Sequence, residues 1–348
     1  MRGLYEICGC LHIHFHLPSG KNAIRQVAAE AERAGLDFVI LSSHTPGETV
    51  ARRYQPLFRE EFVQGNTCVL FAEEADERAE HSHLLVFNVS RWTGRRPLEQ
   101  VLSRVKEEGG FAFIAHPEGT HRLFGGFVDH RWKKNHLVPE VAGVEVWSLL
   151  FDWAGRTTPL NLVERYFGFP DNLCGPGARN LRLWDTMAQE RPAAGVAGLD
   201  IHPVFLPWLD VKRNFRYQTV FGVLRNHLLL RRPLSGTLSE DKQAIYAALR
   251  QGTLFFANDH LADSRGFFFG APDGSWTMGE QAPAGSSAVV SAPQECTIRL
   301  IRNGAVIRSV EARQGQFRLE KEGVFRVECL IEGRPWLFSN HIRVGNCC

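Results

Sequence analysis

Histidine and acidic residues stand at the ends of most of the short apolar runs in the N-terminal part of the chain. The first run, LYEICGCLHIH, ends in a His-x-His pair. The side chains of this kind beside the successive runs are His12, His14, His44, Glu74, His83, His116, Asp200 and His202. Imidazole and carboxylate groups together suit zinc, manganese or iron. If these side chains converge on one point, they would hold metal ions, and such a centre usually carries out chemistry.

The elements that must position these side chains are strands that alternate with helices. Apolar runs predict strands over 5–13, 37–41, 67–72, 84–89, 111–115, 141–147, 193–199, 219–224 and 253–257. Helical spacing of apolar residues predicts helices over 21–35, 97–108 and 239–251. The alternation implies crossover connections and a parallel sheet. Ligands at many strand ends favour a closed barrel, because the carboxyl ends of its strands build one face.

The pattern changes after residue 265, where short alternating segments are separated by Gly, Asn and Pro turns. This pattern is typical of a small all-β sandwich. We therefore expect a barrel over residues 1–265 and a β-sandwich module over residues 266–348. His341 is an isolated histidine in this module, and we expect it to be structural.

Composition narrows the expected partners and location. A formal net charge of +2 argues against a nucleic-acid or anionic membrane partner. No apolar stretch approaches the roughly 20 residues of a membrane span, and the N-terminus lacks the order of a signal peptide. We expect a cytoplasmic protein that acts on a small molecule. Cys8 and Cys10 face the same side of the first strand and could touch a metal, but no second cysteine pair has zinc-finger spacing.

The ordered motifs LHIHFH, GLDFVILSSH, AEEADERAEHSHLLVF, GGFAFIAHP, GVEVW and AGLDIHP resemble the PHP (polymerase and histidinol phosphatase) superfamily of metallohydrolases. The resemblance covers residues 5–260. The C-terminal segment is similar to the β-module of the carbaryl-hydrolase-like branch. The resemblance implies an α/β fold, in which a distorted (β/α)7 barrel carries a two- or three-metal site at the strand C-termini.

The resemblance also assigns ligands. One metal would be held by His12, His14, Glu74 and Asp200. Glu74 would bridge to a second metal, whose other ligands are His83 and His116. His44 and His202 match the ligands of the third metal where one exists. We prefer Glu74 to Glu73 because the family's glutamate lies two residues beyond a small residue, here Ala72, and His83 to His81 because His83 directly precedes LLVF.

Two departures from the family pattern bear on the third metal. A family ligand that follows the His-x-His motif falls near Gly20, and the aspartate that precedes the third-site histidine is replaced by Ser43. We therefore expect two tightly held divalent ions (zinc, manganese or iron) and a weak or empty third position. His16, on the strand face of His12 and His14, is the alternative that would complete the third site.

The predicted chemistry is hydrolysis. Two cations that share a carboxylate lie about 3.5–4 Å apart and generate a hydroxide between them, and they stabilise charge that develops on the substrate. His44 and His202, if they bind no metal, would have an acid or electrostatic role. Long insertions over 118–140 and 150–192, which include Trp153 and Phe167, would build the substrate pocket.

A phosphoester is the favoured substrate. The alternatives are a carbamate or carboxylic ester, and a metal-stabilised binding domain without catalysis. A metallo-β-lactamase motif needs an aspartate where Phe15 stands. An amidohydrolase needs a bridging lysine, and none follows an expected strand.

Overall fold

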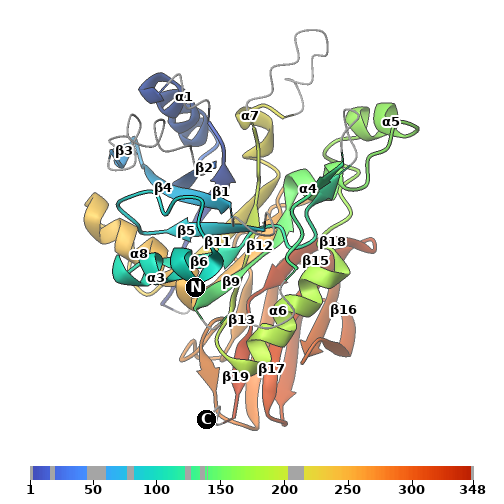
Figure 1. Cartoon of the computed structure of the whole chain (residues 1–348). Coiled ribbons are helices and arrows are strands. Elements are labelled where there is room, and N and C mark those ends of the chain that lie inside the picture. Colours follow the sequence, from blue (N-terminus) through green and yellow to red (C-terminus); the bar gives the residue numbers. More distant parts are fainter. Residues whose placement is uncertain are drawn as a thin grey trace.

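The computed structural model describes residues 3–15, 20–44, 60–76, 82–121, 127–133, 138, 140–202 and 215–345. In Figure 1 the strands and helices of the N-terminal part lie above a lower layer built by the C-terminal strands. No helix in the described ranges is both long and apolar enough to span a membrane.

A ring of paired strands forms the upper part. In pairing order these strands are β1 (Tyr5–Ile13), β2 (Phe38–His44), β4 (Thr67–Asp76), β5 (His83–Phe87), β6 (Phe111–Ile114), β9 (Val141–Ser148) and β10 (Ala194–Gly198). The chain after β10 returns to β1, because Leu199 N donates to Leu11 O and Asp200 N donates to His12 O. The short β3 (Phe62–Gln64) pairs with β4.

Helices surround this ring (Figure 1). They are α1 (Gly20–Arg33), α3 (Leu98–Glu107), α4 (Leu149–Ala154), α5 (Leu162–Phe167), α6 (Ala178–Glu190), α7 (Tyr217–Val220) and α8 (Leu238–Gln251). In α3 the buried residues are Leu98, Val101, Leu102 and Val105, a spacing that places them on one helical face. This face packs against β6 and joins the main core.

The expectation of a parallel sheet is wrong for part of the ring. The pairs β1–β2, β2–β4, β6–β9 and β9–β10 are parallel, whereas β5 runs antiparallel to both β4 and β6. The segment from Asp76 to His83 is too short for a crossover, because a parallel connection needs a dozen or more residues. One reversed strand therefore creates both antiparallel pairs.

A second correction concerns the strand expected over 219–224. Helix α7 occupies the start of this range. The strand β11 (Leu224–Leu230) begins only at the last residue of the range. Strand β11 pairs antiparallel with the first half of β1 and with β12 (Leu254–Asn258). The apolar run NHLLL forms the strand in place of TVFGVL.

The C-terminal segment is all-β, as its pattern predicts. Its strands are β13 (Phe268–Gly270), β14 (Gln281–Ala282), β15 (Ser286–Arg302), β16 (Ala305–Leu319), β17 (Gly323–Ile331), β18 (Arg334–Ser339) and β19 (Ile342–Val344). Strand β18 pairs antiparallel with β12, and the second core includes Leu229 and Phe255 from β11 and β12. Hydrogen bonds and apolar packing therefore cross residue 265, and the division there remains a prediction. A small hairpin, β7 (Thr120–His121) with β8 (Val128–Asp129), lies apart from the main sheet.

Candidate metal centre

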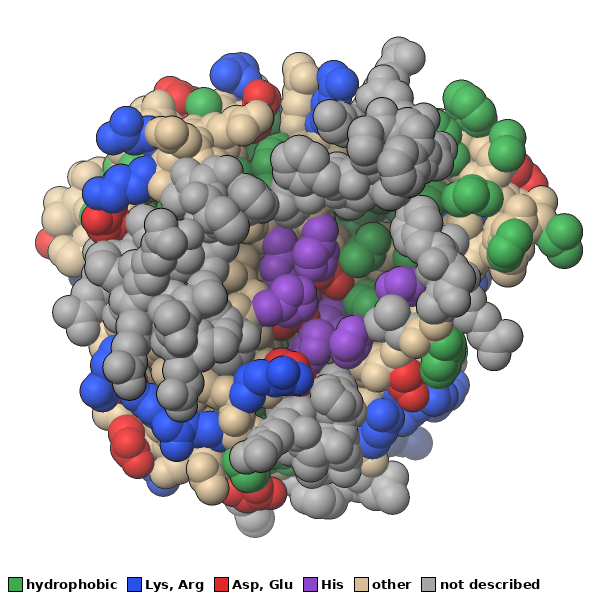
Figure 2. All heavy atoms as spheres, turned by 45° about the horizontal axis from the view of Figure 1, so that its top comes forward, with side chains coloured by type: hydrophobic (Ala, Val, Ile, Leu, Met, Phe, Trp, Pro, Cys, Tyr) green, Lys and Arg blue, Asp and Glu red, His purple; other side chains and the backbone are tan. Residues whose placement is uncertain are grey.

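One edge of the ring gathers the predicted ligands, and Figure 2 shows histidine side chains together in a hollow of the surface. His12, His44 and Glu74 lie in the C-terminal parts of β1, β2 and β4, and His116 and Asp200 follow β6 and β10. His83 is the first residue of β5. Because β5 is reversed, its start reaches the edge at which the parallel strands end.

The first group of ligand atoms comprises His12, His14, Glu74 and Asp200. Glu74 Oε2 lies 3.4 Å from His12 Nε2 and 3.1 Å from His14 Nε2. Asp200 Oδ1 lies 3.5 and 3.3 Å from the same two nitrogens. All four atoms are buried without a hydrogen-bond partner among the described residues. Buried polar atoms are nearly always satisfied, and a divalent cation among these four would satisfy them all. The residues therefore fit a metal ion.

The other oxygen of Glu74 faces a second group. Glu74 Oε1 lies 2.6 Å from His83 Nδ1 and 2.9 Å from His116 Nε2. His44 Nδ1 lies 2.9 Å from Glu74 Oε2. Burial would raise the pKa of Glu74, but the surrounding histidines outweigh it and hold this pKa well below its usual range. Glu74 is therefore an ionised carboxylate that touches both groups.

His44 and His202 lie at the solvent side of the centre. Their Nε2 atoms are 3.1 Å apart, and both form a third group with His14. Burial, followed by the neighbouring His14, lowers the pKa of His202 to about 4. Burial also opposes a charge on His44, but Glu74 outweighs it and raises the pKa of His44. A neutral His202 can therefore accept a hydrogen bond from His44 at this distance.

The backbone is bent at three of the candidate ligands. His12, His116 and Asp200 have φ angles of 60°, 26° and 51°. A left-handed conformation of this kind costs a residue with a side chain on the order of 1–3 kcal/mol and persists only where the surroundings impose it. Such strain clusters at functional sites, which agrees with the convergence of these three side chains.

Glu145, in the motif GVEVW, carried no predicted role. Glu145 lies in β9 with no exposed surface. Its Oε1 lies 2.9 Å from His12 Nδ1, and its Oε2 accepts a hydrogen bond from His116 N at 2.7 Å. A carboxylate on one ring nitrogen directs the other nitrogen to a metal. A charged residue within an apolar buried run was the signal that could have identified it.

The other acidic and histidine residues near these motifs lie in different places. Glu73 points to the other side of β4, where its Oε2 accepts a hydrogen bond from Thr93 N at 2.6 Å. His16 and His81 lie outside the described residues. His130, which the sequence analysis did not single out, places its ring centroid 4.2 Å from that of His83. It therefore lies beside the second group.

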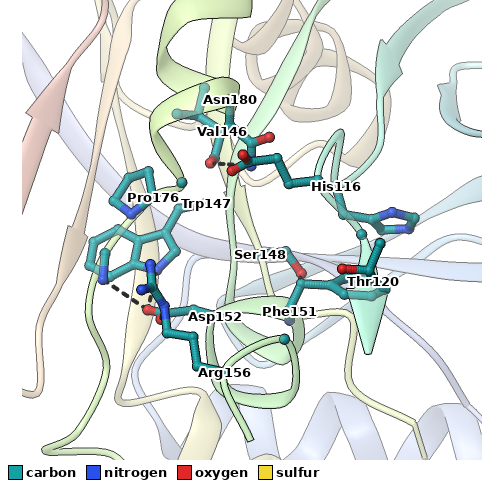
Figure 3. A pocket seen from close by; sticks show the side chains of 15 residues that line it. His116, Thr120, Val146, Trp147, Ser148, Phe151, Asp152, Arg156, Pro176 and Asn180 are labelled. Carbon is teal, nitrogen blue, oxygen red and sulfur yellow. Dashed lines mark hydrogen bonds and ion pairs between the residues drawn. The ribbon is translucent and has the colours of Figure 1, made fainter. Parts of the chain in front are cut away.

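A cavity of about 150 Å³, open to solvent, adjoins His116. Figure 3 shows Phe151 and Thr120 on one side of it, and Arg156 near Asp152 on the other. Asp152 accepts a hydrogen bond from Trp147 at 3.0 Å and pairs with Arg156 at 3.2 Å. The insertion over 150–192 thus contributes to the cavity.

The two aromatic residues singled out from this insertion do not line the cavity. Trp153 is buried against Phe215, and Phe167 is 79% exposed.

Similarity to known proteins is confined to solved structures of low sequence identity. No family model and no curated protein matches the chain. A two-domain protein from Bacteroides vulgatus, which contains a predicted PHP-like metal-dependent phosphoesterase, is 13% identical and has a TM-score of 0.48, with 97% of this chain and 96% of that chain covered. A candidate metal-dependent phosphoesterase from Bifidobacterium adolescentis is also 13% identical and has a TM-score of 0.29, with 60% and 94% covered. At these scores, function must be argued from the site.

Proposed function

We propose that the chain is a PHP-type metal-dependent hydrolase that cleaves a phosphoester of a small molecule. The observation that carries this proposal is the set of four buried, unpartnered ligand atoms of His12, His14, Glu74 and Asp200. The ring from β1 to β10 is, in this proposal, the distorted (β/α)7 barrel of that superfamily. The carbaryl-hydrolase-like branch, the cytoplasmic location and the absence of a nucleic-acid partner stay predictions.

The donor sets assign the ions. His12, His14, Glu74 and Asp200 would hold one divalent ion. Glu74, His83 and His116 would hold a second, within reach of His44. When bound, a zinc, manganese or iron pair supplies a water of lowered pKa and stabilises charge on the substrate oxygen.

The protein's own groups orient ligands and handle protons. Glu145 fixes the ring of His12 and holds the backbone of His116. Where His44 holds no ion, its half-exposed ring lies at the solvent side of the centre, with Nδ1 2.9 Å from Glu74 Oε2. From this place an imidazole can donate a proton to the oxygen of a leaving group, which is the role of a general acid.

The guanidinium of Arg156 supports a phosphoester, although it pairs with Asp152 and Glu118 also lines the cavity. Arg156 carries a half-exposed guanidinium into the cavity, and arginine matches the geometry of phosphate oxygens. The ester alternative also has a specific observation in its favour. The Phe151 ring lies 4.6 Å from that of His116 and offers an apolar surface to the aryl group of a carbamate or carboxylic ester.

The deciding experiment combines metal analysis with a substrate panel. Purified protein is assayed with a phosphomonoester, a phosphodiester, an aryl carbamate and an aryl ester, before and after chelation. We expect phosphoester turnover that is lost with the metal and restored by it. Arg156→Gln should raise KM for the phosphoesters and leave the neutral aryl substrates unaffected.

Two outcomes would contradict the proposal. Turnover that survives complete metal removal excludes the mechanism for any substrate. Bound metal without turnover of any substrate in the panel favours the non-catalytic binding domain.

A further inference from the structure

A second cluster of metal-ligating side chains lies in the first half of β1, four residues before His12 and so about 13 Å along the strand. Cys8, His227 of β11 and Asp259, which follows β12, place one ligand atom each within 4.8 Å of one another. His227 Nε2 is 3.9 Å from Cys8 Sγ and 3.1 Å from Asp259 Oδ2. Ser264 Oγ also lies 3.1 Å from this nitrogen.

A carboxylate and an aromatic ring fix the orientation of the His227 imidazole, as they often do for a histidine that binds a metal. Glu6 Oε1 lies 2.8 Å from His227 Nδ1, and Glu6 Oε2 accepts a hydrogen bond from Gly266 N at 2.7 Å. The His227 ring stacks on Phe255 with an angle of 4° between the planes. A carboxylate on the outer nitrogen fixes the ring and its tautomer, so that the inner nitrogen faces the metal.

The spacing suits a tetrahedral ion. Zinc bonds of about 2.3 Å to sulfur and about 2.0–2.1 Å to nitrogen and oxygen place tetrahedral ligand atoms about 3.6 Å apart for S···N and about 3.3 Å apart for N···O. The corresponding separations here are 3.9 and 3.1 Å. Adjustments of a few tenths of an ångström would therefore make room for an ion, and the separations resemble those in the candidate metal centre.

We propose that Cys8, His227 and Asp259 bind one structural zinc ion, with Ser264 Oγ beside the fourth position. The site is independent of the proposed hydrolase function. It joins three separate parts of the chain, namely β1, β11 and the segment that leads from β12 into β13. Its role is to fasten the first strand to the junction with the C-terminal strands.

The cluster carries charge that suits a cation. Burial opposes a charge on His227, but Cys8, Asp259 and Glu6 outweigh it and raise its pKa. Arg225 Nη1 lies 3.6 Å from Asp259 Oδ2 and offsets part of the acidic charge. A dication binds the Cys8 sulfur as a thiolate and the His227 ring through its inner nitrogen, and any proton on either atom is released to solvent.

Cobalt(II) provides the test, because a thiolate bound to cobalt gives a near-ultraviolet charge-transfer band that imidazole and carboxylate ligands do not give. Full-length protein, freed of metal, is titrated with cobalt(II) and then with zinc. We expect a thiolate–cobalt band whose intensity at saturation corresponds to one thiolate-bound cobalt ion per chain, while the other centre takes up cobalt without adding to the band, and the band should disappear when zinc is added. Cys8→Ala should abolish the band and lower the zinc content by one equivalent, whereas metal-dependent turnover persists.

Cys10→Ala is the matched control. Cys10 is buried two residues away on the same strand, and its thiol donates to Leu224 O at 3.5 Å, so this variant should keep the band. Asp259→Asn changes the same site without altering a cysteine, and it should weaken cobalt binding at the thiolate. It provides the test if Cys8→Ala does not fold. Absence of a band in the wild-type protein overturns the proposal. Equal loss of the band in Cys8→Ala and Cys10→Ala overturns it as well.

Discussion

At the scale of single residues, Glu74 is the side chain that both ligand groups share, since its two oxygens face different histidines. Glu74→Gln keeps the shape but removes the charge that lets two dications lie close together. Bringing two dications within ~4 Å costs roughly 17 kcal/mol even at an effective dielectric of 20, and an amide does not offset this. We expect loss of the metal pair and of nearly all turnover, measured by metal analysis and activity.

Glu73→Gln is the control, because Glu73 lies on the opposite face of β4 and bonds to Thr93 N. A glutamine oxygen can still accept that hydrogen bond, so metal content should be retained. If Glu73→Gln loses the metals and Glu74→Gln retains them, the bridging role belongs to Glu73.

Glu145 should act on the metal centre through His12 and His116. Glu145→Gln presents one oxygen and one amide group to two donors, so one of the two hydrogen bonds is lost. Loss of such an outer partner typically weakens metal affinity by about 10–100-fold. A competition titration with a chelator measures this change, and excess metal should restore turnover. Unchanged affinity, or a loss that metal does not rescue, would show that Glu145 serves the fold alone.

The candidate ligands could be located because each stands next to its own apolar run, and strand alternation puts Glu73 and Glu74 on opposite faces of β4. Their assignment as ligands stays a prediction. Glu145 could not be given its role in this way. Its partners belong to β1 and to the segment after β6, and this contact exists only after distant strands have paired. His130 was not predicted to lie near the candidate ligands, because it belongs to an insertion with no strand pattern.

At the scale of elements, strand direction was the property that the sequence did not reveal. A short apolar run reads the same in either direction, so the pattern located β5 but not its reversal. The short segment before His83 was the available signal, because it leaves no room for a crossover. The reversal explains why His83 lies at the start of its strand when the candidate ligands of β1, β2 and β4 lie toward the strand ends.

Helix α6 is tied to the C-terminal strands through Asp185. Arg326 of β17 donates two hydrogen bonds to this carboxylate, at 2.7 and 2.9 Å, and His341 Nε2 lies 2.8 Å from it. His341 is thus structural, as expected. Burial would raise the pKa of Asp185, but Arg326 and His341 outweigh it and lower this pKa to about 2.

This lowered pKa predicts an acid-sensitive contribution to stability. A carboxyl group whose pKa is lower in the folded than in the unfolded protein stabilises the folded state. This contribution is complete at pH values above the unfolded pKa, near 3.9, and it is lost as the pH falls towards 2. The shift corresponds to about 2 kcal/mol. Denaturant unfolding measured between about pH 5 and pH 2 should show this loss in the wild-type protein and not in Asp185→Asn.

Asp185→Asn should itself destabilise the protein at neutral pH by roughly 1.5–3 kcal/mol, because it removes the charge that accepts two hydrogen bonds from the buried Arg326, whose other charged partner, Glu328, remains. Asp263→Asn, at an exposed pair with Arg265, is the control and should change stability little. Parallel pH dependence in the wild type and Asp185→Asn would contradict the assignment to Asp185.

At the scale of the whole molecule, the two parts predicted from the change of pattern share a sheet and apolar packing. The change from helical spacing to short alternating segments located the all-β segment well. It carried no information on partners, because strand pairing between β12 and β18 depends on the edge that the folded ring exposes. Asn340 strengthens the connection, since its side chain donates to Gly195 O and Leu254 O and accepts from Gly195 N.

We therefore expect the parts on either side of residue 265 to unfold together. A chain that ends after Ala262 would uncover Leu229, Phe255 and Ala257, which belong to the second core and are at most 4% exposed. It would also leave the edge of β12 without its partner. Such an edge with an apolar face promotes aggregation, so the shortened chain should be poorly soluble or unfold at a lower temperature than the full chain.

Calorimetry of the full chain tests this coupling without truncation. We expect one unfolding transition, and Asn340→Ala should move the whole transition to lower temperature. Each buried backbone group that it leaves unsatisfied costs about 1–3 kcal/mol, and these groups belong to β10 and β12 rather than to the C-terminal strands. Two separate transitions, of which Asn340→Ala shifts only one, would show that the ring and the C-terminal strands fold as independent units despite the sheet that joins them.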